Sequence, residues 1–273
     1  MIRNRRILVT GGAGSIGNEL IRQLVSDTLY TFDQDETGVF DLVEELKLKG
    51  HDINGRVADV RDSKEVDDIF KEFKPDLVFH CAALKHVTPN ESYPLEAIKT
   101  NVIGTYNMIE VCRKYGAKLV NISTDKVIHS NSVMGTTKKL AEIMVKNAGF
   151  VSVRFGNVLG SRGSVIPIWQ QQADSGEPLT ITDERMERFF MTIPQAVKLV
   201  IDAEKIAKAG QIIILDMGKP IKILDLAKQI IEKSGKNIGL KVIGVREGET
   251  LTEKLMTDEE IKRAKKVGNY YVI

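Results

Sequence analysis

Short, almost wholly apolar runs alternate with longer segments in which apolar residues recur every three or four positions, over about the first 154 residues. The first pattern is typical of a parallel strand covered on both faces, and the second of an amphipathic helix. The chain therefore alternates strand and helix, which predicts an α/β fold with a Rossmann-type, doubly wound parallel sheet. Strands are predicted at residues 7–10, 29–33, 56–60, 76–83, 119–123 and 150–154, and helices through Leu20 and Leu24 and at 38–49, 63–73, 94–115 and 134–147.

The alternation loosens after residue 155. A loop rich in glycine and polar groups covers residues 155–167, and one more helix and strand of the main sheet are predicted at 195–207 and 211–216. The remaining pieces predict a second, smaller C-terminal lobe that closes over a substrate: a helix through Trp169, the segment 178–183, a charged turn at 184–188, a helix at 223–234, a strand at 241–245, a turn at 246–249 and a final helical stretch. The main domain is expected at 1–155 plus about 190–218, and the lobe at 156–189 plus 219–273.

The sequence TGGAGSIG at residues 10–17 lies between the first predicted strand and the first helix. A tight turn, a close approach of the backbone to a pyrophosphate and close helix–strand packing each require a glycine here. The free N–H groups at the start of the helix would hold the phosphates. A lone glycine pattern is weak, but this strand and helix supply the context that a dinucleotide site needs. The predicted contacts are Gly11, Gly14, Ser15, Ile16 and Gly17.

The second predicted strand ends in Asp33, 22 residues beyond Gly11. A carboxylate there can accept both ribose hydroxyls and would repel a 2′-phosphate, which favours NAD over NADP. Alternatively, Asp33 or its neighbours Asp35 and Glu36 only start the next helix. We favour the cofactor interpretation because the spacing agrees with the fingerprint.

The ends of the third and fourth predicted strands supply further cofactor candidates. Asp59 and Val60 could flank the adenine, or Asp59 could cap the helix that follows, and the sequence does not decide between the two. Ala82 and Ala83 are small enough to let a dinucleotide lie close to the backbone.

Polar residues also follow the fourth strand and enter the next helix. Lys85 and His86 come after the strand's carboxyl end, so we interpret them as candidates for substrate binding. His80 is interpreted as a core or strand-end histidine. Asn101 lies inside a predicted helix, where it either bonds the backbone of a neighbouring strand or is a satisfied core amide; we favour a structural role.

The segment Ser-Thr-Asp-Lys at 123–126 follows the fifth strand and opens into the crevice where ligands bind in this fold class. Thr124 can hold a substrate hydroxyl, and Asp125 can deliver a proton to a leaving oxygen. Lys126 acts as a base only if its pKa falls well below ~10.4, and burial, a positive nicotinamide and a second amine at Lys138 would lower it. Because Asp125 and Lys126 are adjacent on an irregular strand end, we expect them to point in different directions, and they need not form a mutual ion pair. The alternative is a solvated loop with a surface salt bridge.

The composition narrows the class of protein without naming it. The 273 residues are 42% hydrophobic and 28% charged, and a net charge of +2 gives no long-range attraction to nucleic acid or anionic membrane. The longest apolar runs have the length of strands, and the basic N-terminus is followed by too short an apolar run for a signal peptide. Cys81 and Cys112 lack metal-site spacing and read as buried thiols. We expect a soluble cytoplasmic protein without a structural metal.

Several motifs together resemble a known family. TGGAGSIG followed by MGTTK is similar to the extended short-chain dehydrogenase/reductases, in which a Tyr-x-x-x-Lys pair does the catalysis; Met134 stands at the tyrosine position here. The motifs CAALKHV, ESYPLEAIKTNVIGT, STDKV, MGTTKK, RFGNVLGSRGSVIP, RFFMTIPQAV and EGETLTEKL resemble the CapD-like polysaccharide-biosynthesis branch. That branch contains UDP-N-acetylglucosamine 4,6-dehydratases and related nucleotide-sugar epimerases, and the resemblance covers residues 6–273.

The resemblance implies a mechanism and a set of roles. Bound NAD removes hydride from C4 of the sugar, the Lys126 equivalent takes the C5 proton, the Asp125 equivalent helps to expel the C6 hydroxyl, and hydride returns to C6. Thr124 positions the C4 oxygen, and Lys138 binds the nicotinamide ribose. A UDP-sugar is the implied partner, and homo-oligomers are expected. The implied substrate-binding residues, with His86 added from its position, are Lys85, His86, Asn157, Arg188, Arg246 and Glu249.

Met134 cannot accept a proton, so another group must deprotonate the C4 hydroxyl, either Asp125 or a water molecule. Several dehydratases of the branch share this methionine, so it does not indicate loss of function. A UDP-N-acetylglucosamine 4,6-dehydratase is the leading hypothesis, with inversion at C5 as a separate expectation. The alternatives are a 4-epimerase acting on UDP-glucose or UDP-N-acetylglucosamine, and a non-catalytic, NAD-binding regulator.

Overall fold

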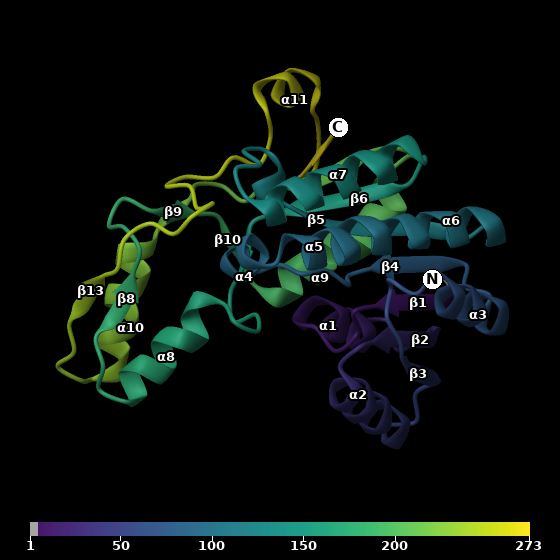
Figure 1. The fold of residues 1–273 in the computed structure, drawn as a ribbon, viewed down its shortest axis with the longest axis horizontal. Helices are drawn as coiled ribbons and strands as arrows, with labels where there is room; N and C mark the ends of the chain where they lie inside the picture. Colours follow the sequence, from purple (N-terminus) through teal and green to yellow (C-terminus); the bar gives the residue numbers. More distant parts are fainter. Residues whose placement is uncertain (1–4) are drawn as a thin grey trace.

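A nine-stranded sheet forms the centre of the computed structural model, which describes residues 5–273; residues 1–4, the first part of the basic N-terminus discussed above, lie outside it. The order β14-β15-β11-β6-β5-β4-β1-β2-β3 is parallel except at β14 and β15, and it confirms the predicted α/β, Rossmann-type class (Figure 1). The strands are β1 (Arg6–Thr10), β2 (Thr28–Asp33), β3 (Ile53–Val57), β4 (Leu77–His80), β5 (Lys118–Thr124), β6 (Val151–Phe155), β11 (Ile212–Leu215), β14 (Lys265–Val267) and β15 (Tyr270–Val272).

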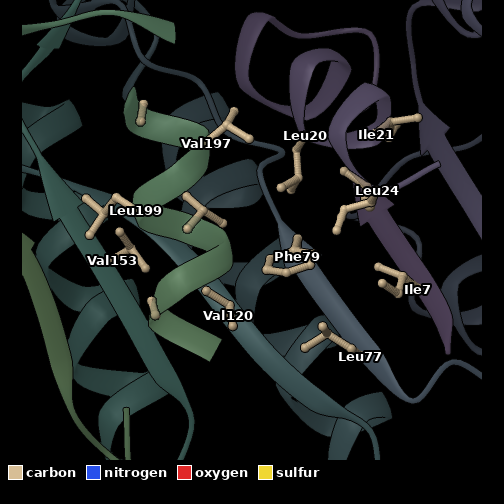
Figure 2. Packing of buried hydrophobic residues seen from close by; sticks show 14 of the residues in the cluster. Ile7, Leu20, Ile21, Leu24, Leu77, Phe79, Val120, Val153, Val197 and Leu199 are labelled. Carbon is tan, nitrogen blue, oxygen red and sulfur yellow. The ribbon is translucent and has the colours of Figure 1, made fainter. Parts of the chain in front are cut away.

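Helices cover both faces of this sheet, which is why its strands are apolar throughout. Ile7 and Val9 pack into one core together with α1, α2 and α9, whereas Leu8 packs into a second core with α3, α6 and α7. Figure 2 shows the first core, where Leu20 and Val197 come from the adjacent helices α1 and α9. The helices are α1 (Ser15–Gln23), α2 (Glu36–Leu48), α3 (Ser63–Phe73), α6 (Thr105–Tyr115), α7 (Val133–Asn147) and α9 (Ile193–Ile206).

Two strands end earlier than the sequence predicts. β3 is shifted from the predicted 56–60 to Ile53–Val57 because it is the outermost strand, where Asn54 and Arg56 need no burial on both faces. Ala58 and Val60 are buried all the same, since they pack into the second core after the strand has ended. β4 ends at His80, so Cys81, Ala82 and Ala83 lie beyond the sheet.

The helix predicted at 94–115 is interrupted by a π-helical segment, η1 (Ile98–Gly104), between α5 (Pro94–Ala97) and α6. Asn101 lies in η1 and is completely buried. Its side chain accepts a hydrogen bond from the Leu84 N–H (2.8 Å) and donates to the Leu84 carbonyl (2.9 Å), which confirms a structural role. His80 is likewise a buried strand-end histidine, bonded to Thr10 at 2.8 Å and Thr105 at 3.1 Å.

The smaller lobe has its own core around Trp169, which is fully buried and donates to the Thr180 carbonyl at 2.7 Å. In Figure 1 the lobe lies beyond the carboxyl ends of the main strands, away from α3 and the N-terminus. Its main elements are α8 (Val165–Asp174), β8 (Leu179–Ile181), α10 (Ile223–Ser234) and β13 (Leu240–Val242). The remaining short elements are α4 (Val87–Ser92), η2 (Asp125–Val127), β7 (Asn157–Val158), β9 (Glu187–Arg188), β10 (Phe190–Met191), β12 (Ile221–Lys222) and α11 (Asp258–Arg263).

The C-terminal residues return to the main sheet, although we expected all of 219–273 in the lobe. β15 pairs antiparallel with β11, and Val272 packs into the first core, because a strand next to β11 buries an apolar row that would otherwise be exposed. The final helical stretch is the single short helix α11. Within residues 5–273, no helix combines the length and apolar character needed to cross a bilayer.

Candidate functional site

A groove of about 130 Å³ lies at the carboxyl ends of β1, β2 and β4, and the glycine-rich loop forms one wall. Gly11 has φ +72°, and a Cβ atom on it would lie 2.7 Å from the Ala82 nitrogen. A Cβ on Gly17 would lie 2.3 Å from the Gly11 carbonyl, so α1 could not pack so close to the loop. Both glycines therefore meet the steric requirement from which they were predicted. The predicted residues lining the groove are Gly11, Gly14, Asp33, Asp59, Val60, Ala82 and Ala83.

The acidic candidates do not cap helices. Asp33 accepts hydrogen bonds from the N–H groups of Ala13 and Asp35, each at 3.1 Å, and Asp35 is the residue that caps α2. Asp59 pairs with Arg61, while Asp62 caps α3. Although burial raises the pKa of Asp59, the hydrogen bonds from Arg61 leave that pKa below its usual value. Asp33 and Asp59 therefore both line the groove, free of any helix-capping role.

A segment of the chain, residues 161–163, crosses to the glycine-rich loop. The Arg162 N–H donates to the Ser15 hydroxyl at 2.9 Å, and the Arg162 guanidinium pairs with Asp35 at 2.9 Å. Lys85 donates to the Arg162 carbonyl at 2.7 Å, and Gly163 packs against the His86 ring. Lys85 and His86 thus hold this segment and are not among the residues that line the larger cavity described next.

A second cavity, of about 200 Å³, lies between the main domain and the lobe. Lys126 and His129 line it from the main domain, and Trp169 and Ile223 line it from the lobe. Four predicted substrate-binding residues reach it: Asn157, Arg188, Arg246 and Glu249. Arg188 is only 5% exposed, and its guanidinium donates to the carbonyls of residues 187, 250 and 251, so it shapes the wall of the cavity.

Thr124, Asp125 and Lys126 form one hydrogen-bonded group at the edge of this cavity. The Lys126 Nζ lies 2.9 Å from Asp125 Oδ1 and 3.1 Å from Asn157 Oδ1, and the Thr124 hydroxyl donates to the same Asp125 oxygen at 3.0 Å. The prediction that Asp125 and Lys126 point apart was wrong. The chain leaves β5 in the 3-10 turn η2, so the alternation of an extended strand does not apply to these residues.

Lys138 lies on α7, one turn after Met134, and both side chains are buried. Its Nζ donates to the Ile122 carbonyl at 2.6 Å. Burial lowers the pKa of Lys138 to about 8. The same environment raises the pKa of the Cys81 thiol to about 12, which leaves that cysteine unreactive.

Glu253 also belongs to this group, although the sequence analysis did not single it out. Its Oε1 lies 4.0 Å from the Lys126 Nζ, its side chain is 4% exposed, and burial raises the pKa of its carboxyl. Its Oε2 and the neighbouring Thr250 hydroxyl are buried without a hydrogen-bond partner within residues 5–273. The motif EGETLTEKL contains Glu253, but spacing alone could not show that it meets residue 126.

A buried ionic cluster, made of Glu142, Arg154 and Glu260, holds two segments of the chain next to the site. Arg154 is 2% exposed and pairs with Glu142 and with Glu260 at 2.8 Å. Glu142 accepts from the Ser123 hydroxyl, next to Thr124, while Arg154 donates to the Leu255 carbonyl at 2.9 Å. One cluster thus fixes the chain on both sides of the site.

Both the sequence and the structure of the chain are similar to those of known proteins. A family profile described as "Polysaccharide biosynthesis protein" matches residues 7–273. The chain is 43% identical, over 95% of its length, to the capsular polysaccharide biosynthesis protein CapD of Staphylococcus aureus, but spans only 46% of that protein. It is 34% identical over its whole length to a UDP-glucose 4-epimerase of Rickettsia canadensis (strain McKiel), of which 84% is covered. The X-ray structure of Pen from Bacillus thuringiensis matches with a TM-score of 0.95 and 36% identity, covering 99% of this chain and 88% of that one.

Proposed function

The chain belongs to the polysaccharide biosynthesis protein family, as the sequence motifs predicted, and on that premise we propose that it is a UDP-N-acetylglucosamine 4,6-dehydratase. The observation that carries the proposal is the contact of 2.9 Å between Lys126 and Asp125 at the wall of the cavity. Dehydration needs a base at C5 and an acid at C6 of the same sugar, so two such groups side by side suit it.

The groove fits a nicotinamide dinucleotide. A glycine is required at residue 11 because a side chain there would clash with the backbone of Ala82, and Asp33 places a carboxyl group beside the glycine-rich loop. Carboxylates at Asp33 and Asp59 would repel a 2′-phosphate, which supports NAD rather than NADP. When bound, the dinucleotide supplies the oxidant that removes hydride from C4 of the sugar and later returns it to C6.

The protein's own groups handle the protons. A proton passes from the Lys126 ammonium to Asp125 across their 2.9 Å contact, which leaves a neutral amine and a protonated carboxyl. The amine then takes the C5 proton, the electrons of that C–H bond form the C5–C6 double bond, and the C6–O bond breaks. Asp125 returns its proton to the departing oxygen, which leaves as water. Inversion at C5 would follow if the proton comes back to the opposite face.

The lobe side of the cavity carries groups suited to binding the nucleotide part of a substrate. Arg246 is exposed at the wall, and its guanidinium has no hydrogen-bond or ion-pair partner in the described part of the chain. A guanidinium suits a pyrophosphate because its fork donates two hydrogen bonds. Trp169 and Ile223 offer apolar surface nearby. We therefore propose a UDP-sugar as the substrate class.

Incubation with UDP-N-acetylglucosamine and mass spectrometry of the sugar nucleotide tests the proposal. A dehydratase yields a product lighter by one water, a 4-keto-6-deoxy sugar. An unchanged mass combined with a new configuration at C4 would contradict dehydration and identify a 4-epimerase.

The 4-epimerase is the second candidate, because a relative with that name is 34% identical over the whole chain. Epimerisation shares the oxidation at C4 but needs neither a C5 base nor a C6 acid. The paired Asp125 and Lys126 would then have no chemical task, so we place the dehydratase first. A non-catalytic regulator would leave this buried cluster of titratable groups unexplained.

A further inference from the structure

Oxidation at C4 releases a proton from the C4 hydroxyl, and the site must contain a group that accepts it. The superfamily uses a tyrosine for this step, but Met134 has no acid–base chemistry. The same requirement holds for a dehydratase and for an epimerase, since both begin with this oxidation. The acceptor can therefore be sought among the cavity residues without deciding between the two reactions.

Asp125 is poorly placed to accept this proton. Its Oδ1 already accepts from both Thr124 and Lys126, and the residue is completely buried. Its other oxygen, Oδ2, is buried without a hydrogen-bond partner among the described residues, but it lies beside Gly156, and Asp125 is not one of the residues that line the cavity. In the dehydration above, Asp125 must also be protonated when the C6 oxygen leaves. A carboxyl group that already carries a proton cannot accept the proton of the C4 hydroxyl in the same turnover.

Glu253 has the geometry that Asp125 lacks. It lines the cavity, and its Oε2 is buried without a partner among the described residues, whereas an unsatisfied carboxylate oxygen is costly to bury. A sugar hydroxyl in the cavity would supply the missing hydrogen bond. Its Oε1 lies 4.0 Å from the Lys126 amine, so one carboxyl group both lines the cavity and approaches the amine.

We propose that Glu253 is a third catalytic residue, which accepts the proton of the C4 hydroxyl when the sugar is oxidised. The O–H bond breaks and its electrons form the C4 carbonyl, while the hydride goes to the oxidised nicotinamide dinucleotide. The proton forms a new bond to Glu253 Oε2. The role deepens the proposed function, because it assigns an acceptor for the first step of that reaction.

The arrangement also closes the proton balance of a dehydration. Glu253 gains one proton from the C4 hydroxyl, and Asp125 loses one to the departing water. The Lys126 amine lies between them, 4.0 Å from Glu253 Oε1 and 2.9 Å from Asp125 Oδ1. A proton handed from Glu253 to Lys126 and from Lys126 to Asp125 therefore restores the starting state without exchange with bulk water.

The surroundings of Glu253 raise the pKa of its carboxyl above the usual value. Burial is the largest cause and the nearby Asp125 adds to it, while Lys126, Arg188 and the Thr250 hydroxyl oppose the shift. A carboxylate with a raised pKa is a stronger base than an ordinary surface glutamate. Two residues further along, the Leu255 carbonyl is held by Arg154, which fixes the segment that carries Glu253.

A Glu253→Gln variant tests the proposal through the oxidation step alone. After mixing with UDP-N-acetylglucosamine or UDP-glucose, the absorbance of the bound nicotinamide should show reduction slowed by about 10²-fold or more. Glu253→Asp should recover part of this rate. In the wild-type protein the rate of reduction should fall as pH drops through the pKa of Glu253, and this acid limb should disappear in the glutamine variant. Calorimetric titration with UDP, without turnover, should show unchanged affinity.

Lys126→Ala serves as the matched control, because it should allow nicotinamide reduction and block loss of water. Reduction at the wild-type rate in Glu253→Gln would overturn the proposal, and so would a joint loss of UDP affinity and of reduction, which indicates a structural role. Wild-type protein that reduces its cofactor but releases no water contradicts the dehydratase alone and leaves the role of Glu253 standing. Wild-type protein that reduces no cofactor with either sugar contradicts both.

Discussion

Lys126 is the residue whose surroundings restrict the chemistry most. Its amine contacts Asp125 and Asn157, faces Glu253 and lines the cavity between the two parts of the molecule. An amine held by carboxylates can act as a base only after it passes a proton to one of them. In the proposed mechanism, the contact that holds Lys126 in place is therefore also the contact through which its amine loses a proton.

Lys126→Ala should bind NAD as the wild type does and lose turnover by about 10²- to 10⁴-fold, because the variant lacks the proposed acceptor of the C5 proton. Fluorescence titration with NAD and mass spectrometry of the product measure the two effects. Lys139, an exposed lysine on the following helix α7, supplies the control, and Lys139→Ala should retain full turnover. Turnover that survives in Lys126→Ala would remove this amine from the mechanism.

Asp33→Ala should narrow the preference for NAD over NADP. The carboxylate accepts from Ala13 and Asp35 at the groove, and its removal takes away the charge that repels a 2′-phosphate. Dissociation constants for the two dinucleotides give the ratio. Asp35→Ala removes the α2 cap and leaves Asp33 in place, so it should reduce stability without changing that ratio. An unchanged ratio in Asp33→Ala would limit Asp33 to bracing the loop.

Lys138 makes stability depend on pH. Its pKa is about 8 in the folded protein against a usual 10.5, so between these values the unfolded chain binds more protons. The unfolding free energy should therefore rise with pH from about 8 upward, by up to about 3 kcal/mol from this residue. Urea unfolding from pH 7 to 10 measures it, with Lys138→Met as the comparison. A wild-type curve parallel to that of the variant would rule out the effect.

Glu253 shows which site residues sequence reasoning misses. The groove glycines and the Ser-Thr-Asp-Lys group could be predicted because each lies in one local motif next to a strand. Glu253 is 127 residues from Lys126 in the sequence, and only the packing of the segment before α11 brings the two together. The contact between Asp125 and Lys126 was missed for a different reason, since a 3-10 turn replaces the strand there.

Among the elements, the helices and inner strands of the main domain were the most predictable from sequence. Burial on both faces makes their strands apolar without interruption, and amphipathic helices cover them. The edge strand β3 and the C-terminal strands β14 and β15 carry a weaker pattern, because polar residues are tolerated at a sheet edge. The π-helical segment at Asn101 has no periodic signal of its own.

The buried ionic cluster links α7, β6 and α11 through Glu142, Arg154 and Glu260. An Arg154→Met variant tests how much this link contributes to stability and to turnover. Leaving Glu142 and Glu260 buried without their cation should cost about 3–5 kcal/mol of unfolding free energy. Turnover should fall as well, since the cluster holds the Leu255 carbonyl and, through Glu142, the Ser123 hydroxyl.

Chemical unfolding and product formation in Arg154→Met measure these two effects. Arg263→Met, an exposed arginine at the end of α11, is the control and should change neither by much. Full activity in a destabilised Arg154→Met protein would separate the cluster from the geometry of the site.

At the scale of the whole molecule, each part contributes one kind of binding surface. The groove lies in the main domain, whereas the cavity is shared with a lobe that has its own core around Trp169. A lesion in the lobe should therefore affect the sugar nucleotide and spare the dinucleotide.

Trp169→Ala should destabilise the lobe by about 3–5 kcal/mol, because the fully buried indole fills its core and bonds Thr180. UDP binding should weaken while NAD binding stays unchanged, as calorimetric titrations with each ligand would show. Equal losses for both ligands would indicate that the two parts unfold as one unit.

The crossing segment 161–163 should slow the dissociation of a dinucleotide from the groove. Bonds from Arg162 to Ser15 and Asp35, and from Lys85 to Arg162, tie that segment over the start of α1. A redox carrier that ends every cycle in the form in which it began has no need to leave between cycles. We expect the protein to emerge from purification with its nucleotide still attached, so that dialysis alone fails to strip it, unlike a dehydrogenase that must trade coenzyme at each round.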